Sequence, residues 1–156
     1  MDITATYSFA APPSEVWNLL MDPDAIAACL PGCCELRPLP ALSGVEGGDD
    51  RYQAELIIGV AAVSGTFTAT IALSDKVPPH SYRLQVDATG KPGFAHGSAT
   101  IALSAEQNGT SAHVTAAANV GGLIARVGQR LLEGVARMTM DRFYGCLAKR
   151  VAGAGS

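Results

Sequence analysis

The side chains that could carry out chemistry in this chain are few and widely spaced. Four cysteines stand at Cys29, Cys33, Cys34 and Cys146, and three histidines at His80, His96 and His113. A metal site built from the first three cysteines would need a fourth ligand from a distant part of the chain. Because adjacent Cys33 and Cys34 make a poor disulfide framework, we interpret the cysteines as ordinary reduced thiols.

No familiar catalytic motif accompanies these residues. The chain contains no GxSxG elbow, no HExxH pair and no glycine-rich phosphate loop. His96 and His113 fall out of phase with the apolar positions of their strands, and so do Glu55 and Asp87, so all four are predicted to face solvent. The sequence therefore identifies no catalytic residue, and it indicates no metal ion or cofactor held by this chain.

Composition narrows the class of protein further. Apolar residues make up 48% of the 156 residues, and the formal net charge is -3, which argues against disorder and against nucleic-acid binding. The charge is uneven, since residues 122–152 carry six basic and two acidic side chains. Two readings stay open: a solvated helix face, or contact with an acidic partner or membrane surface through Arg126, Arg130 and Arg137.

The first residues, Met-Asp-Ile-Thr, have neither the basic nor the apolar region of a signal peptide, and the sequence has no run of 18 apolar residues. We therefore expect a cytoplasmic protein, with peripheral contact to the inner face of the membrane as the alternative to free diffusion.

Hydrophobic periodicity indicates the elements that must position these groups. Alternation predicts a strand over residues 2–10, and two short helices follow at 14–21 and 23–29, the second capped by Asp22 with Pro23 in its first turn. Residues 40–50 are predicted to be a loop. Further strands are predicted at 35–39, 51–60, 63–73, 82–88, 95–103 and 111–120, with a hairpin turn at Asn108-Gly109. Short connections make them an antiparallel meander.

A long helix is predicted over residues 122–152, with one apolar stripe that needs a sheet to cover it. We expect one domain over residues 1–152 and a flexible tail over 153–156.

The covered face of the sheet is rich in small residues, among them Ala69, Gly97 and Ala99, and the chain has 26 alanines. Either the helix lies close to the sheet, or the two enclose an apolar pocket. The candidate lining residues for such a pocket are Phe67, Ala69, Tyr82, Phe94, Ala99, Leu131, Val135 and Met138.

Several stretches, in order, resemble the family named after the G subunit of carbon monoxide dehydrogenase. They are APPSEVW at 11–17, DP at 22–23, CLPGC at 29–33, GKPGFAHG at 90–97, VGG at 120–122 and GQRLL at 128–132. This family belongs to the START-like, Bet v 1-like helix-grip superfamily. The resemblance implies an α+β helix-grip fold, in which a curved antiparallel sheet of about seven strands surrounds a long C-terminal helix and a hydrophobic cavity.

For function, the resemblance implies a non-catalytic accessory protein of a molybdenum-containing carbon monoxide dehydrogenase or related hydroxylase. Such proteins are linked to membrane recruitment of the enzyme and to a quinone-like or lipid-like molecule. Longer members carry a C-terminal membrane anchor, and this sequence stops at Ser156 without one. Two alternatives remain: a polyketide cyclase or aromatase that uses the same cavity, with Tyr82 and Arg130 as the polar groups to inspect, and a docking adaptor whose cavity is incidental.

Overall fold

The computed structural model describes residues 1–39, 50–59 and 64–154. The first part of the chain forms β1 (Asp2–Phe9), α1 (Pro13–Met21), α2 (Pro23–Cys29) and β2 (Cys33–Pro38). The strands β3 (Asp50–Ile58), β4 (Gly65–Val77), β5 (Ser81–Gly90), β6 (Gly93–Glu106) and β7 (Gly109–Gly121) follow. A short 3₁₀ helix, η2 (Leu123–Val127), leads into α3 (Gln129–Ala154). The predicted loop at 40–50 lies outside the described residues up to position 49, as do the junction at 60–63 and the last two residues of the predicted tail.

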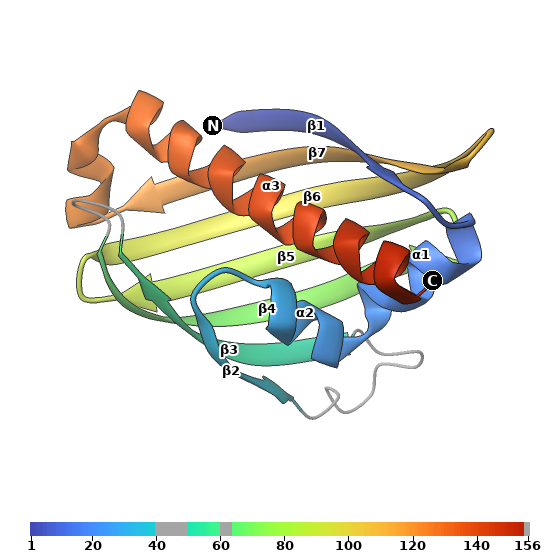
Figure 1. Cartoon of the computed structure of the whole chain (residues 1–156). Helices are drawn as coiled ribbons and strands as arrows, with labels where there is room; N and C mark the ends of the chain where they lie inside the picture. Colours follow the sequence, from blue (N-terminus) through green and yellow to red (C-terminus); the bar gives the residue numbers. More distant parts are fainter. Residues whose placement is uncertain (40–49, 60–63, 155–156) are drawn as a thin grey trace.

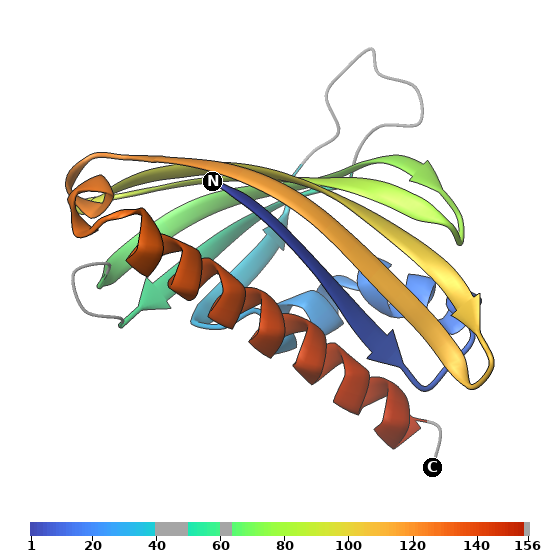
Figure 2. The same ribbon diagram turned by 90° about the horizontal axis from the view of Figure 1, so that it is seen from above.

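The strands form one seven-stranded sheet in the order β1-β7-β6-β5-β4-β3-β2, with every neighbouring pair antiparallel. Strands β2 to β7 are thus a meander, and β1 joins it beside β7. The sheet is strongly curved, and α3 crosses its concave side, with α1 and α2 at one end of the same side (Figures 1 and 2). The helix-grip fold expected from the sequence is confirmed.

Alternation of side chains along each strand decides which face is covered. In β4, Phe67, Ala69, Ile71 and Leu73 are buried, while Thr66 and Thr68 are exposed. Register carries this inward face across the sheet: Ile71 lies opposite Tyr52 and Val86, and Ala69 lies opposite Ala54 and Ala88. A one-residue slip would turn all of these side chains outward, so burial of this face sets the register.

The two short helices begin as predicted. Pro13 is the first residue of α1, and Pro23 is the first residue of α2. The Asp22 carboxylate accepts a hydrogen bond from the backbone N–H of Asp24 at 3.0 Å, which satisfies one of the free donors of the first turn of α2.

The predicted continuous helix over 122–152 is wrong at its start. Gly122 and Gly128 have φ values of +81° and +99°, and these two positions bracket η2 and separate it from α3. Glycine has no Cβ, so it takes up such angles at little cost and lets the chain change direction twice. At the other end, the backbone of α3 continues to Ala154, so it extends into the predicted tail.

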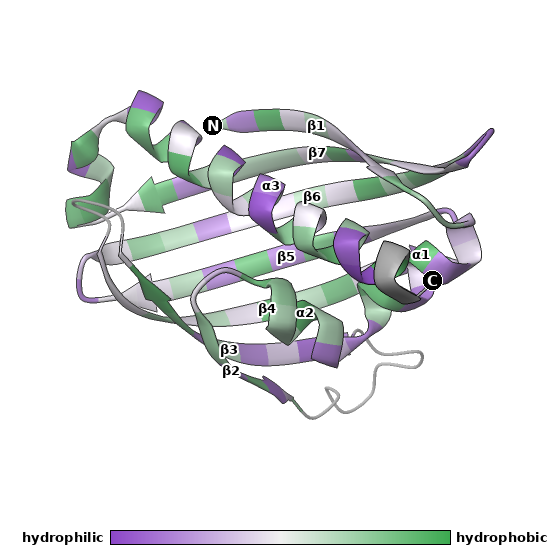
Figure 3. Cartoon of the chain, viewed as in Figure 1, coloured by the Kyte–Doolittle hydropathy of each residue, from purple (hydrophilic) through white to green (hydrophobic). Residues whose placement is uncertain are grey.

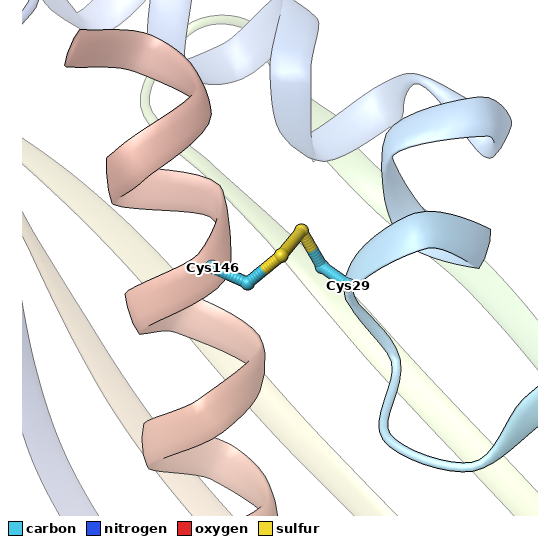
Figure 4. Close-up of a disulfide and its surroundings, with 2 residues drawn as sticks. All are labelled: Cys29 and Cys146. Carbon is cyan, nitrogen blue, oxygen red and sulfur yellow. A yellow bond between two sulfur atoms is a disulfide. The ribbon is translucent and has the colours of Figure 1, made fainter. Parts of the chain in front are cut away.

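The expectation of four reduced thiols is also wrong. Cys29, the last residue of α2, and Cys146 of α3 form a disulfide across a sequence separation of 117 (Figure 4). Cys33 and Cys34 are free. With Cys29 bonded to Cys146, the metal site considered for Cys29, Cys33 and Cys34 does not form. The sequence could not indicate the pairing, because the two positions meet only once α3 has packed across α2.

Candidate functional site

Two clusters of apolar side chains lie between the sheet and the helices. The larger one, here called the main cluster, joins Leu147, Tyr144 and Val151 of α3 to α1, α2 and the inward side chains of the sheet. The smaller one, here called the end cluster, is built on Phe67 and Ile124. Leu132 and Val135 of α3 pack against the end cluster, together with Leu56, Ile58, Val120 and Val127. The helix is therefore held at both ends by apolar contacts.

The inward face between these clusters is formed by very small side chains. We call Ala95, Gly97, Ala116 and Ala118 the small-residue floor. Each is half-buried, and none belongs to either cluster. Register places Gly97 opposite Val86 on one side and Ala118 on the other, so the floor continues the face that α3 crosses.

The floor is not packed against the helix. A Cβ built on Gly97 would meet only the Ala117 carbonyl oxygen at 3.6 Å and the Ala118 Cβ at 3.8 Å, both from the neighbouring strand. No atom of α3 lies within 4 Å of that point. Protein interiors are normally close-packed, so an apolar floor without contacts from the opposing helix leaves room for another molecule.

Five of the eight sequence-predicted lining residues lie on the inner side. Phe67 and Val135 contribute to the end cluster, Ala69 and Tyr82 are buried in the main cluster, and Ala99 packs half-buried at its margin. They surround the floor from two ends rather than lining one continuous wall.

The other three predicted lining residues lie elsewhere. Phe94 shares its strand face with His96, which bonds Asp87 on the outer surface, and the Phe94 ring lies 5.2 Å from the His96 ring and is 41% exposed. Met138 is nine residues before the buried Leu147, roughly half a turn around α3 at about 100° per residue. Leu131, seven residues before Met138, shares that outer side and is 40% exposed. Apolar type alone suggested these three, whereas strand phase and helix rotation place them away from the floor.

A row of aromatic side chains, missed in the sequence, runs from the buried end of the floor to the surface. The Trp17 and Tyr82 rings meet edge to face at 5.6 Å, and the Tyr7 and Tyr144 rings stack at 4.6 Å. The Tyr82 and Tyr144 hydroxyls interact with each other, and the Tyr7 hydroxyl donates to Asp141 Oδ1 at 2.8 Å. Their partners come from strands and α3, so no spacing in the sequence could reveal the row.

Burial sets the chemistry of these hydroxyls. It raises the pKa of Tyr82 well above the ordinary value of 10.0, and it raises the pKa of Tyr144 as well. Both groups therefore stay protonated at neutral pH and act as neutral hydrogen-bonding groups, not as bases.

The three candidate contact arginines are exposed. Arg137 donates from Nη1 to the Thr4 carbonyl oxygen at 3.5 Å, at the edge of β1. Among the described residues, neither Arg126 nor Arg130 forms a salt bridge. Beside them lie two exposed leucines, Leu123 at 60% and Leu131 at 40%. Figure 3 shows hydrophilic and hydrophobic residues mixed along the exposed side of η2 and α3.

The predicted solvent-facing polar residues are confirmed as exposed. His96 Nδ1 lies 2.7 Å from Asp87 Oδ1 on the outer face, and His113 Nδ1 lies 3.1 Å from the Thr6 hydroxyl. Two surface pockets formed by described residues are shallow and lie elsewhere: one of about 180 Å³ beside Arg83 and Thr100, and one at the β6–β7 hairpin. Neither gathers a set of catalytic groups. In the described part of the chain, no helix combines the length and apolar character needed to cross a membrane.

Comparison with known proteins places these features in context. The family model of CoxG, the G subunit of carbon monoxide dehydrogenase, matches residues 6–152. A conserved protein from Geobacillus kaustophilus is 34% identical, with a TM-score of 0.87 over 99% of this chain and 97% of that one. No curated protein sequence matches this chain significantly.

Two more distant structures share the fold alone. Ara h 8.0201 is 8% identical, with a TM-score of 0.70 over 98% of each chain. The di-domain aromatase/cyclase StfQ of the steffimycin biosynthetic pathway is 12% identical, with a TM-score of 0.62 over 97% of this chain and 52% of that one.

Proposed function

Because the chain belongs to the CoxG family of carbon monoxide dehydrogenase, we propose that it is a non-catalytic accessory protein that binds a hydrophobic small molecule between α3 and the sheet. The observation that carries the proposal is the small-residue floor, which no atom of α3 contacts at Gly97. A flat, apolar molecule of the quinone or lipid class fits such a surface, since it needs apolar contact and few polar partners.

The aromatic row supplies a polar end to this site. Tyr82 is 3% exposed and lies in the main cluster beside Leu84 and Ala99. Its hydroxyl, kept neutral by burial, is suited to donate a hydrogen bond to a ligand carbonyl oxygen. Tyr82→Phe should therefore weaken ligand binding by about 5- to 10-fold, the effect of about 1 kcal/mol for one hydrogen bond.

The proposal is tested by filling the floor. Ala118→Trp places a large ring over the floor, whereas Ala117→Trp, one residue earlier, places the same ring on the exposed outer face. Native mass spectrometry and solvent extraction of gently purified protein should show a stoichiometric apolar compound in the wild type and in Ala117→Trp, and none in Ala118→Trp. Equal ligand content in the two variants would contradict the proposal.

A membrane-facing role is supported by the surface around η2. Arg126 and Arg130 lie beside exposed Leu123 and Leu131, a combination that suits contact with anionic lipid headgroups and the acyl chains beneath them. We propose peripheral contact with the inner face of the cytoplasmic membrane, where a molybdenum hydroxylase-type enzyme would be the protein partner.

Vesicle cosedimentation tests this contact. Arg126→Glu with Arg130→Glu should abolish binding to vesicles that contain phosphatidylserine, while Arg83→Glu on the outer face of the sheet should leave it unchanged. Binding that survives the first pair would exclude this surface, and binding to the enzyme alone would favour the adaptor interpretation.

A cyclase-like activity is the second candidate, and the buried Tyr82 and Tyr144 hydroxyls are the observation that favours it. It predicts turnover of a polyketide-like substrate that is lost in Tyr82→Phe while the protein stays folded. Binding without turnover would leave the carrier function.

A further inference from the structure

The disulfide joins the two elements that close one end of the site. Cys29 ends α2, Cys146 lies in the C-terminal half of α3, and their Cα atoms are 5.4 Å apart (Figure 4). In Figure 1, α2 lies to one side of α3 and the sheet lies behind both. A covalent bond at this point limits how far α3 can move away from α2 and from the sheet.

The contacts around the bond divide α3 into two parts. On the C-terminal side of Thr139, the buried Tyr144, Leu147 and Val151 join the main cluster, and the Tyr7 hydroxyl bonds Asp141. On the N-terminal side, only Leu132 and Val135 pack against the end cluster. The N-terminal side carries the less extensive apolar contacts and follows the break at Gly128, so movement of α3 as a whole is limited chiefly where Cys146 is tethered.

The redox setting makes this tether informative. Disulfides within reducing compartments are usually transient, and they serve catalysis or redox sensing. The cytoplasmic location proposed above would place Cys29 and Cys146 in such a compartment. Cys33 and Cys34, four and five residues after Cys29, are free thiols in the same structure, so the chain combines one bridged pair with two reduced cysteines.

We propose that the Cys29–Cys146 disulfide is a redox latch that controls access to the ligand site. A dithiol reductant donates two electrons and two protons, the S–S bond is replaced by two thiols, and the reductant itself becomes a disulfide. The freed α3 then separates from α2 more often, and ligand exchange becomes faster. The access step rests on the proposed ligand-binding function, whereas the loosening of α3 does not.

The test uses the full chain with Cys33→Ser and Cys34→Ser, in which Cys29–Cys146 is the one bridge that can form. Thiol titration of the air-oxidised, unfolded protein should find no free thiol, and two after treatment with dithiothreitol. Hydrogen exchange of residues 139–151 should become at least 10-fold faster on reduction, while exchange in β4 and β5 stays within 2-fold. Two titratable thiols in the oxidised protein, or equal exchange of α3 in both states, would overturn the latch.

Ligand access is measured with the apolar dye anilinonaphthalene sulfonate. Its dissociation should be at least 10-fold faster from the reduced protein and from Cys29→Ala/Cys146→Ala than from the oxidised protein. Dye that binds with one rate in all three would overturn control of access. Dye that binds none of them would instead count against the ligand site, and hydrogen exchange would then decide the latch by itself.

Discussion

Removal of the Cys29–Cys146 disulfide should cost this domain a large part of its stability. The bond closes a loop with a sequence separation of 117. Restricting the unfolded chain by a loop of this length is worth about 5 kcal/mol in the loop-entropy treatment, slightly above the value of about 4.7 kcal/mol for 100 residues. Since small domains are stable by about 5–15 kcal/mol in total, the reduced protein should be marginal.

Urea unfolding followed by tyrosine and tryptophan fluorescence measures this difference. We expect Cys29→Ala/Cys146→Ala, and wild type in dithiothreitol, to unfold with a free energy about 3–5 kcal/mol below the oxidised wild type, and with a Tm lower by roughly 10–20 °C. Cys34→Ser, which removes an exposed free thiol, is the matched control and should behave as wild type. A loss below about 1 kcal/mol in both reduced forms would refute the reasoning, because the loop would then contribute nothing to the unfolded ensemble.

Three further predictions concern the fold. Gly128→Ala should lower the free energy of unfolding by about 1–2 kcal/mol, since a Cβ there would meet no neighbour but φ is +99°, whereas Gly134→Ala inside α3 should raise it by about 0.5–1 kcal/mol; chemical denaturation compares the two, and equal effects would contradict the conformational explanation. Thr110→Val removes a buried hydroxyl that donates to the main-chain carbonyl before α1 at 2.6 Å, and should cost about 1–3 kcal/mol by the same assay, whereas a neutral result would show that water replaces it. Tyr82 and Tyr144 have pKa values raised by burial, so the unfolded chain loses protons first as the pH rises through about 10; stability present below that pH should then fall by about 1.4 kcal/mol per pH unit for each tyrosine, and Tyr144→Phe should halve the slope.

Local patterns predicted the architecture because they depend on nearest neighbours in the chain. The alternation of threonine with apolar residues in β4 needs no tertiary information, and the same holds for the Asp22-Pro23 start of α2. Short connections then leave a meander as the simplest pairing, and a single apolar face requires one covering helix. The ordered stretches shared with the CoxG family predicted the helix-grip fold, which the family match and the sheet order confirm.

The candidate site was predicted in part. Phe67, Ala69 and Tyr82 were identified correctly as inward-facing because β-strand phase places them without ambiguity. Phe94 and Met138 were chosen by apolar type, which does not report the face of the strand or helix on which a residue lies. The aromatic row could not be found in advance, because its contacts join residues that are more than a hundred positions apart, such as Tyr7 and Asp141.

By itself, the sequence determined the type and order of the elements and the side of each strand that is buried, since these follow from short-range periodicity. Only the tertiary structure decided how α3 is placed. The positive φ values at Gly122 and Gly128 turn the chain before α3, the packing of α3 across α2 brings Cys146 to Cys29, and the same placement leaves Gly97 without a contact from the helix. Each of these depends on the position of one rigid element relative to another, which no local pattern encodes.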